Sequence, residues 1–472
     1  MEEKLLAVGM KTECGVLGVW TPKAENINCS KLLLIYLQHR GQDSCGVGWY
    51  NTKNNSVDVL HSLGKVENLI DKNVNINNES QLFIGHTRYT TSSKDKSLLD
   101  SAHPIKGRFR GQDYAFVFNG NIPQSDNDTE FIVKFLKNVE ESKDFSGAIE
   151  HFIKRVDRAY NIIFIYDNKL WVVRDPYGTR PLHLCVIPDG TIVVASETCV
   201  FDKYNNSGSK DSFITEIKAG NYTLIENGYI KNIDVVKLKN TAFCLFEYIY
   251  FMKQKSQSKI SGKSVGEMRY LLGVELAKQE KTDSNELVDK DNIIVSGIPN
   301  TANDYARGYA DEMGYEYSQI IQKVSNSMRT FIEPSKEQRE KASLKKYHYL
   351  ENEIRGKHII LVDDSIVRGI TIENIARKIR SFEPLGVHIR VGCPPITNTC
   401  NLGVDMSKRE ELIINTHLDI ESIRDTIGVD SLIYLRLENI NEVMNLSNFC
   451  TGCMNGNFNG SPDANYPKYL EW

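Results

Sequence analysis

The stretch IILVDDSIVRGIT, from Ile359 to Thr371, decides the fold of the second half of this chain. Its first four residues are all apolar, as in the central strand of a parallel sheet that is covered on both faces. Ligands of open α/β sheets bind beyond the carboxyl ends of such strands. Asp363 and Asp364 stand at that end, and Gly369 follows in a loop. The stretch therefore predicts a buried strand, an anion-binding loop and a helix, in that order.

The acidic pair has two interpretations. Asp363 and Asp364 can accept hydrogen bonds from ribose hydroxyls or hold Mg²⁺, while the backbone N–H groups of residues 366–371 and the helix N-terminus bind a phosphate. The alternative is a strand that ends in a solvated acidic turn, and for an isolated Asp-Asp this alternative is favoured. Here a serine, an arginine, a glycine and a threonine follow in an order that favours a sugar-phosphate site. We therefore expect a ribose phosphate to bind at this end of the sheet.

Composition and charge exclude several classes of protein. The 472 residues are enough for roughly two or three domains with sizeable cores. A net charge of -4 argues against sequence-independent binding of nucleic acid. A mean hydropathy of -0.36 and the lack of any long apolar run argue against a membrane span. Residues 1–13 lack the basic and apolar regions of a secretory signal, so we expect a cytoplasmic protein.

The hydrophobic pattern changes near residue 240. Before it, short strand-like runs alternate with turns, and a helix is expected over Asp128–Asn138, capped by short side chains of the preceding SDND. This pattern favours a layered α+β domain. After residue 241, helices alternate with buried strands, as in a parallel α/β sheet. The expected strands are 81–84, 114–118, 162–165, 170–173 and 191–195 in the first half, and 292–298, 358–362, 387–391 and 432–435 in the second.

Several segments together resemble a known family. VDDSIVRG resembles the phosphoribosyl pyrophosphate (PRPP) signature of the glutamine amidophosphoribosyltransferases, which commit PRPP to purine synthesis. Further segments resemble the two halves of these enzymes in the expected order, so the likeness covers nearly the whole chain. They are CGVLGVW from Cys14, LQHRGQDSCGVG from Leu37, GHTRYTT from Gly85, NGNI from Asn119, RDPYGTRPL from Arg174, FEYIYF from Phe246, RTFIEP from Arg329 and DSLIYL from Asp430.

This resemblance implies a particular domain organisation. Residues 1–13 would be a propeptide, and residues 14–240 an α+β N-terminal-nucleophile hydrolase domain with four αββα layers. Residues 241–472 would form an α/β type I phosphoribosyltransferase domain with a parallel sheet, and its C-terminal segment would bind a metal cluster.

A glutaminase site in the first half is also implied by the resemblance. Cys14 matches the nucleophile, whose own α-amine acts as base once the propeptide has been removed. Arg88 matches the clamp for the glutamine carboxylate, and Asp128 matches the partner of the α-ammonium group. Asn119 and Gly120 match the oxyanion hole. Taken singly, the arginine would be a surface ion pair, the aspartate a helix cap and the Asn-Gly pair a hairpin turn.

In the second half the resemblance implies a PRPP site with magnesium. Thr301, Asp363 and Asp364 match positions that hold Mg²⁺, although Asn300 lacks the acidic charge that the family carries beside the hydroxyl. We therefore expect weaker metal binding. The residues assigned to PRPP are Asp363, Asp364, Ser365, Ile366, Val367, Arg368, Gly369, Thr371, Lys323 and Arg329.

The loop from Lys323 to Ile332, KVSNSMRTFI, departs from the family, which reads close to KNRYVGRTFI there. In the family this loop closes over PRPP and shields the reaction from water. Ser325, Asn326 and Ser327 offer no aromatic or cationic group in place of the missing arginine and tyrosine. We expect weaker closure, measurable as a raised KM for PRPP or as glutamine hydrolysis that is poorly coupled to transfer.

Cys450 and Cys453 form a Cys-x-x-Cys pair, which alone could be a zinc half-site, a redox pair or two unligated thiols. Cys244 and Cys400 match the two remaining positions in family members that carry an iron–sulfur cluster. Four thiolates suit a [4Fe–4S] cluster, and zinc could use the same ligands. The resemblance implies a structural cluster, since neither half-reaction transfers an electron.

The sequence therefore predicts a pentosyltransferase that makes 5-phosphoribosylamine from PRPP and glutamine, the first committed step of purine synthesis. Its expected cofactors are Mg²⁺ and a [4Fe–4S] cluster. Expected partners are glutamine, PRPP, nucleotide feedback inhibitors and further copies of the chain in a dimer or tetramer, without nucleic acid or membrane. Two alternatives stay open: a paralogue that aminates another phosphoribosyl donor, and a noncatalytic PRPP-sensing protein, against which the retained glutaminase residues argue.

Overall fold

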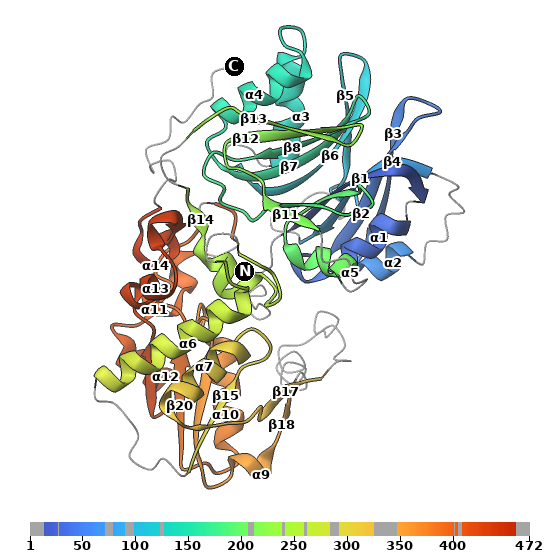
Figure 1. Cartoon of the computed structure of the whole chain (residues 1–472). Coiled ribbons are helices and arrows are strands. Elements are labelled where there is room, and N and C mark those ends of the chain that lie inside the picture. The colour runs from blue at the N-terminus through green and yellow to red at the C-terminus, as the bar shows by residue number, and fades with distance from the viewer. Residues whose placement is uncertain are drawn as a thin grey trace.

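The computed structural model describes most of the chain, in two lobes (Figure 1). One lobe holds two antiparallel sheets with helices on their outer faces, and the other holds a parallel sheet with helices packed on it. The described residues are 14–26, 28–70, 79–89, 99–122, 127–205, 212–237, 241–258, 262–283, 292–324, 347–400, 402–404 and 408–458.

Two antiparallel sheets form the centre of the first lobe. The first sheet has the strand order β11-β9-β10-β1-β4-β2-β3, and the second has the order β13-β12-β8-β7-β6-β5. The strands of the first sheet are β1 (Gly15–Asn26), β2 (Ser44–Asn51), β3 (Ser56–Leu63), β4 (Glu79–Arg88), β9 (His183–Val186), β10 (Ile192–Ala195) and β11 (Phe213–Glu216). Those of the second are β5 (Ile105–Phe109), β6 (Gln112–Asn121), β7 (Ala159–Tyr166), β8 (Lys169–Arg174), β12 (Asn221–Glu226) and β13 (Tyr229–Asp234).

Three apolar clusters hold the layers of this lobe together. Between the sheets, side chains such as Val16 of β1 and Val117 of β6 are fully buried. The helices α3 (Asp128–Val139) and α4 (Phe145–Arg155) pack on the second sheet. On the first sheet lie α1 (Asn28–Ile35) and α2 (Val66–Ile70). The result is the predicted αββα arrangement. Its short helices are η1 (Gln38–Arg40), η2 (Thr198–Phe201) and α5 (Asp202–Asn205).

A five-stranded parallel sheet with the order β16-β15-β19-β20-β21 forms the centre of the second lobe. Its strands are β15 (Ile293–Gly297), β16 (Glu316–Tyr317), β19 (His358–Asp363), β20 (Gly386–Val391) and β21 (Ser431–Tyr434). The central β19 carries the four apolar residues 359–362, all fully buried, as expected for a strand covered on both faces. The predicted parallel α/β sheet is therefore confirmed.

Helices and short strands surround this sheet. The helices are α6 (Val265–Thr282), α7 (Asn303–Met313), α9 (Glu351–Ile354), α10 (Ile370–Arg380), α11 (Ile413–Thr416), α12 (Ile420–Ile427), α13 (Leu437–Val443) and α14 (Gly452–Asn455). A π-helical turn, η3 (Glu247–Phe251), and the 3₁₀ turns η6 (Arg409–Glu411) and η7 (Leu446–Asn448) accompany them. Two small ribbons pair β14 (Phe243–Cys244) with β22 (Phe449–Cys450), and β17 (Ile321–Lys323) with β18 (Tyr347–Tyr349).

Local signals explain where several of these helices begin. The Asn127 side chain accepts hydrogen bonds from the N–H groups of Thr129 and Glu130 at the start of α3, as the polar SDND predicted. Ser264 and Glu267 form a capping box at the start of α6. Within the part of the chain that the structure describes, none of the helices has the length and apolar character that a membrane crossing needs.

Candidate active sites

Cys14 stands directly before β1, at the end of the sheet that also carries Arg88. In the antiparallel β1–β4 ladder Gly15 lies opposite Thr87, so Cys14 comes opposite Arg88. Burial lowers the pKa of the Arg88 guanidinium, and the charges of Cys14 and Asp43 act against that fall. The sulfur and the guanidinium are therefore electrostatic neighbours, an arrangement that favours an anionic, nucleophilic sulfur.

A buried arginine that the sequence analysis did not single out holds the backbone of Cys14. Arg40 Nε donates a hydrogen bond of 3.1 Å to the Cys14 carbonyl oxygen. The Cys14 side chain is half-buried, and its Sγ lies 3.9 Å from the carbonyl oxygen of Tyr89. Arg88 is also half-buried and donates to the Ser101 hydroxyl, so it is not a plain surface ion pair. Cys14 is thus fixed at its carbonyl, with its sulfur beside the end of β4.

Asn119 and Gly120 lie inside β6, opposite Asn161 and Tyr160 of β7, and therefore do not form a hairpin turn. The Nδ2 group of Asn119 is buried and has no hydrogen-bond partner among the described residues. Leaving a buried donor unpaired costs free energy, which a bound oxyanion would recover. A Cβ on Gly120 would come within 2.3 Å of the Ala159 carbonyl oxygen, so this close approach of β7 requires glycine.

A histidine joins this part of β6 to β4. His86 Nε2 lies 2.9 Å from the Phe118 carbonyl oxygen, and the His86 ring stacks on His103 with centroids 4.4 Å apart. Burial lowers the pKa of His86 to about 3, so the ring is neutral and donates to the carbonyl through Nε2. Because His86 and Arg88 are two residues apart on β4, this bond holds Asn119 at the edge of the cysteine site.

Asp128 is the first residue of α3, and its Oδ1 accepts a hydrogen bond of 3.1 Å from the Ile122 N–H. Asn127, not Asp128, caps the helix. Burial raises the pKa of Asp128 to about 6. A cationic partner strongly stabilises the charged form of a buried carboxyl group, which agrees with the predicted contact with an α-ammonium group.

The acidic pair stands at the carboxyl end of β19, where the sequence predicted it. The Ser365 hydroxyl donates to Asp364 Oδ1 at 2.7 Å, and the Asp364 N–H donates to Asp363 Oδ1 at 3.0 Å. Burial raises the pKa of both carboxyl groups, and the neighbouring charge raises that of Asp363 further. A divalent cation would relieve the burial cost and the repulsion, so these donors fit Mg²⁺.

The loop after the acidic pair leads into the N-terminus of α10. Gly369 has a φ of 79°, and a Cβ at this position would meet Ile413 Cδ1 at 2.3 Å, so the turn requires glycine. The Val367 carbonyl accepts the Ile413 N–H at 2.8 Å, and Arg368 forms an ion pair of 2.8 Å with Glu411. The first N–H groups of a helix lack intrahelical partners, so this end of α10 can bind an anion.

The structure places the remaining candidates around this loop. Ile366 is buried beneath it, and Thr371 lies in the exposed first turn of α10. Thr301 follows β15 in a half-buried position. The Ile298 N–H donates to the Val362 carbonyl at 2.9 Å, which holds the segment after β15 beside the end of β19. The predicted hydroxyl and the acidic pair are therefore carried by adjacent strand ends.

Lys323 ends β17 with an exposed side chain and lies opposite Tyr347 of β18. The two strands flank the altered loop. Arg329 and the loop residues Ser325–Ile332 lie outside the described residues, so their predicted roles stay predictions.

Tyr250, a tyrosine near the acidic pair, was missed by the sequence analysis. Burial raises the pKa of Tyr250. The charges of Asp364 and Asp363 raise this pKa further, and Tyr347 and Tyr89 act in the same direction. Tyr89 belongs to the first lobe and lies beside the cysteine site, whereas Tyr250 lies within the FEYIYF segment of the second. The Tyr250 phenol is therefore within electrostatic reach of both candidate sites.

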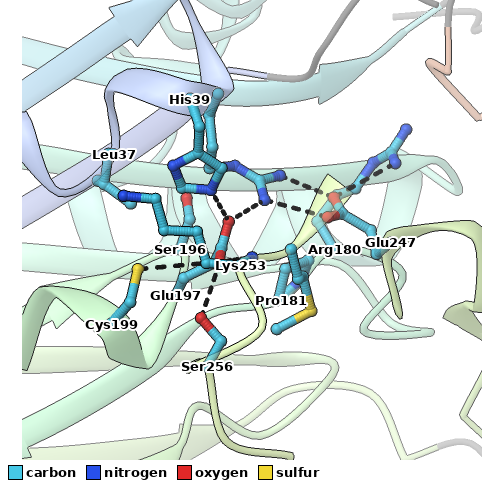
Figure 2. A network of polar contacts seen from close by, with 12 residues as sticks. Leu37, His39, Arg180, Pro181, Ser196, Glu197, Cys199, Glu247, Lys253 and Ser256 are labelled. Atoms are coloured by element: carbon cyan, nitrogen blue, oxygen red, sulfur yellow. Dashed lines mark hydrogen bonds and ion pairs between the residues drawn. The ribbon is translucent and has the colours of Figure 1, made fainter. Parts of the chain in front are cut away.

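A network of buried charges joins the two lobes, and Figure 2 shows it from close by. The Glu197 carboxylate binds His39 at 2.6 Å, Arg40 at 2.7 Å and the Ser256 hydroxyl at 2.8 Å. Arg40 also donates to both oxygens of Glu247, at 2.7 and 3.0 Å. Burial alone would raise the pKa of Glu197, but His39 and Arg40 hold it well below its usual range. The motifs LQHRGQD and FEYIYF contained Arg40 and Glu247, yet nothing in either motif indicated the contact.

The four predicted cluster ligands come together in the second lobe, at the end that lies next to the first lobe (Figure 1). Cys244 lies opposite Cys450 in the β14–β22 pair, and the Cys453 carbonyl accepts the Thr397 N–H at 2.9 Å, close in sequence to Cys400. Burial raises the pKa of Cys453, and the other three thiols raise it further. In the ranges that the structure describes, no group of three or more His, Cys, Asp or Glu side chains has the arrangement of a metal-ion site. Four converging thiols offer the donor set of either a [4Fe–4S] cluster or a zinc ion.

Comparison with known proteins gives relatives of nearly the same length. The amidophosphoribosyltransferase of Archaeoglobus fulgidus is 31% identical and matches 94% of this chain and 97% of its own length. That of Methanocaldococcus jannaschii is 31% identical, over 97% of this chain and 99% of the relative. No protein-family model matches the chain.

Two solved structures resemble the whole chain. The glutamine PRPP amidotransferase from B. subtilis, complexed with ADP and GMP, has a TM-score of 0.77 and 28% identity over 94% of this chain and 97% of its own. A structure described as the allosteric regulatory enzyme of purine biosynthesis has a TM-score of 0.78 and 28% identity over 94% of this chain and 96% of its own. The likeness therefore extends over both lobes.

Proposed function

Because the chain belongs to the amidophosphoribosyltransferase family, we propose that it hydrolyses glutamine at Cys14 and transfers the ammonia to PRPP at the acidic pair of β19. The products are 5-phosphoribosylamine, pyrophosphate and glutamate, which places the enzyme in purine synthesis. One observation carries the proposal. The nucleophile and the acidic pair lie in separate lobes, and the buried contact of Arg40 with Glu247 joins the two beside Cys14.

The first half-reaction uses the α-amine of Cys14, freed by removal of the propeptide, to accept the thiol proton. The sulfur attacks the amide carbon of glutamine, and Asn119 Nδ2 with the Gly120 N–H stabilises the oxyanion that forms. Arg88 binds the glutamine carboxylate, and Asp128 binds the α-ammonium group. Ammonia leaves, and water releases glutamate from the thioester.

The second half-reaction forms a bond between ammonia and C1 of PRPP while the bond to pyrophosphate breaks. Asp363 and Asp364 accept hydrogen bonds from the ribose hydroxyls, and the loop with the N-terminus of α10 binds the 5′-phosphate. Arg368 supplies positive charge within this loop, and Lys323 would supply it from the end of β17. Mg²⁺ at Thr301 and the acidic pair would neutralise charge on the departing pyrophosphate.

Ammonia must reach the second site without entering bulk water, where it would be protonated and lost as a nucleophile. Tyr250 supports an internal route, because groups of both sites act on it. The Cys14 sulfur lies 3.9 Å from the Tyr89 carbonyl oxygen, and the charges of Asp364, Asp363 and Tyr89 all raise the pKa of Tyr250.

We further propose a structural [4Fe–4S] cluster held by Cys244, Cys400, Cys450 and Cys453. Such a cluster would tie the beginning, the middle and the end of the second domain together through metal–sulfur bonds. The convergence of the four thiols supports this assignment, because buried thiols that repel one another as anions are stabilised by a metal centre.

We also propose that nucleotides inhibit this enzyme by feedback. This rests on the B. subtilis relative, whose structure was determined with ADP and GMP. We also propose that residues 1–13 are a propeptide, that the glutaminase domain ends near residue 240 and that the transferase domain follows. The predicted dimer or tetramer stays a prediction.

An assay of the purified protein for glutamate release with and without PRPP tests the proposed function. We expect release to rise on addition of PRPP, with phosphoribosylamine formed in the same amount, because the two sites are joined. A rate of glutamate release that is the same with and without PRPP, with no PRPP consumed, would reject the assignment. Turnover of a different phosphoribosyl donor in its place would favour the paralogue.

A further inference from the structure

A short segment of the transferase half, residues 402–404, lies against the glutaminase half. The Arg180 side chain of the first lobe is fully buried, and its Nη2 donates a hydrogen bond of 2.6 Å to the Leu402 carbonyl oxygen. Through Nη1 the same guanidinium lies 3.7 Å from the Glu247 carboxylate. Leu402 is buried in a small apolar cluster that also contains Ala159 of β7. A charge-assisted hydrogen bond and apolar packing therefore hold this segment to the first lobe.

Gly403 packs on the strand that carries the oxyanion pair. Its φ is 104°, a positive value that residues with a side chain rarely adopt. A Cβ at this position would lie 2.8 Å from the Cβ of Asn121 and 3.0 Å from Arg180 Nη2. Asn121 is the last residue of β6 and directly follows Gly120. The backbone of Gly403 therefore contacts the end of β6 and leaves no room for a methyl group.

Arg180 extends this contact to the neighbouring strand β7. The residue after it, Pro181, accepts a hydrogen bond of 3.0 Å at its carbonyl oxygen from Asn161 Nδ2. Asn161 lies opposite Asn119 in the β6–β7 ladder. Leu402 thus bonds to Arg180, and the next residue of the chain bonds to the partner of Asn119. Both strands around the oxyanion pair are therefore in contact with the transferase half.

The oxyanion pair depends on the exact position of β6. Donors stabilise an oxyanion only when they lie about 2.7–3.1 Å from it, and a small misplacement of reacting groups lowers the rate strongly. On one side, Gly120 approaches the Ala159 carbonyl oxygen so closely that a Cβ would lie 2.3 Å from it. On the other side, Gly403 packs on the residue that follows Gly120. These two contacts together set where the end of β6 lies.

We propose that Gly403 is a positioning residue of the glutaminase site, because its backbone holds the end of β6 where Asn119 and Gly120 can bind the oxyanion. The transferase half thereby supports a site whose reacting groups all belong to the other half. This contact is separate from that of Arg40, which acts on the Cys14 carbonyl rather than on β6. The inference rests on the proposed hydrolysis of glutamine.

The test adds one methyl group to the full-length enzyme at Gly403 and measures each half-reaction. Gly403→Ala should lower kcat for glutamine hydrolysis about tenfold, because the new Cβ pushes on Asn121 and misplaces the oxyanion pair. KM for glutamine should change less, and synthesis from added ammonia should continue at the normal rate. The rate at which iodoacetamide alkylates Cys14, followed by peptide mass spectrometry, should not change, because alkylation forms no oxyanion.

Gly428→Ala is the matched control for backbone strain. Gly428 follows α12 in the same lobe with a φ of 78°, and beyond its chain neighbours a Cβ there would meet no heavy atom within 4 Å. This variant should therefore hydrolyse glutamine normally. A second control combines Gly403→Ala with Asn121→Gly, which removes the Cβ that the new methyl group meets. Relative to Asn121→Gly alone, the double variant should recover much of the lost kcat.

Four results would overturn the inference. A normal kcat in Gly403→Ala would show that the oxyanion pair does not depend on this contact. Equal losses in Gly403→Ala and Gly428→Ala would leave only backbone strain. A loss that Asn121→Gly does not relieve would place its cause elsewhere. Parallel loss of synthesis from ammonia would indicate a general disturbance of the second lobe. Because glutamine hydrolysis is the readout, the comparison also holds if PRPP is not turned over, an outcome that would reject only the proposed transfer.

Discussion

Arg40 donates two hydrogen bonds, of 2.7 and 3.0 Å, to the Glu247 carboxylate, and a third to the carbonyl oxygen of the nucleophile Cys14. Arg40 belongs to the glutaminase half, whereas Glu247 belongs to the FEYIYF segment whose apolar residues pack in the core of the transferase half. Both side chains are fully buried. A shift of either half would therefore be transmitted to the position of Cys14.

Arg40→Lys should uncouple the two half-reactions. Lysine keeps the positive charge but cannot reproduce the planar fork that binds both carboxylate oxygens and the Cys14 carbonyl. We expect glutamate release to exceed phosphoribosylamine formation, as measured in the same reaction mixture. Lysine is the variant of choice, because an uncharged residue would remove a cationic partner from two buried carboxylates and destabilise the fold by about 3–5 kcal/mol.

Arg108→Lys is the matched control, since Arg108 lies in the same half and pairs with Asp113 at the surface. It should retain equal amounts of the two products. An Arg40→Lys enzyme that folds normally and still couples fully would show that this contact is only structural.

Asn119→Ala should remove one donor of the oxyanion hole. The Nδ2 group of Asn119 is buried without a partner among the described residues, as expected for a group that meets the oxyanion. The kcat for glutamine hydrolysis should fall about 10²–10³-fold, with a smaller change in KM for glutamine. Synthesis from added ammonia should continue at the normal rate. Parallel loss of both activities would point to misfolding of β6 instead.

Glutamine use should depend on pH through Asp128. Burial raises the pKa of this carboxyl group to about 6, so the group is neutral below that pH and charged above it. Only the charged form attracts the α-ammonium group, so kcat/KM for glutamine should fall as the pH drops through about 6, the pKa of the free enzyme. Asp128→Asn should show a low kcat/KM without this acid limb. An unchanged limb in that variant would assign the titration to another group.

Iron content tests the proposed cluster. The full chain, purified without oxygen, should be brown and contain roughly four irons and four sulfides per molecule. Cys453→Ser should lose iron and lower the melting temperature, because the cluster links segments that are distant in sequence. Cys185→Ser, at a buried thiol of the other lobe, should keep its iron. A stable protein with zinc in place of iron, or with neither metal, would reject the cluster.

The strand, loop and helix around the acidic pair could be predicted because their determinants are local. Four apolar residues, two carboxylates and Gly369 lie within residues 359–371. As expected, the structure places the apolar residues in β19, the carboxylates at its end and Gly369 directly before α10. The four αββα layers also follow the prediction. The glutaminase residues were assigned by resemblance, since Asn119, Arg88 and Asp128 come from different strands and a helix that no local pattern connects.

The contacts between the halves could not be predicted in the same way. Arg40 and Glu247 are separated by 207 residues, and each alone looks like an ordinary charged residue of a motif. Buried ion pairs depend on the final packing of both domains rather than on any periodicity.

The claim that Cys14 and the acidic pair serve one coupled reaction is tested most directly by measuring phosphoribosylamine formation with glutamine or with ammonia as the nitrogen source. The unmodified enzyme should use both sources. Cys14→Ala should make no product from glutamine but should retain synthesis from ammonia, because the transferase site does not need the sulfur. Glutamine-dependent synthesis that persists in Cys14→Ala, or PRPP that stays unused with either source in the unmodified enzyme, would contradict the two-site mechanism.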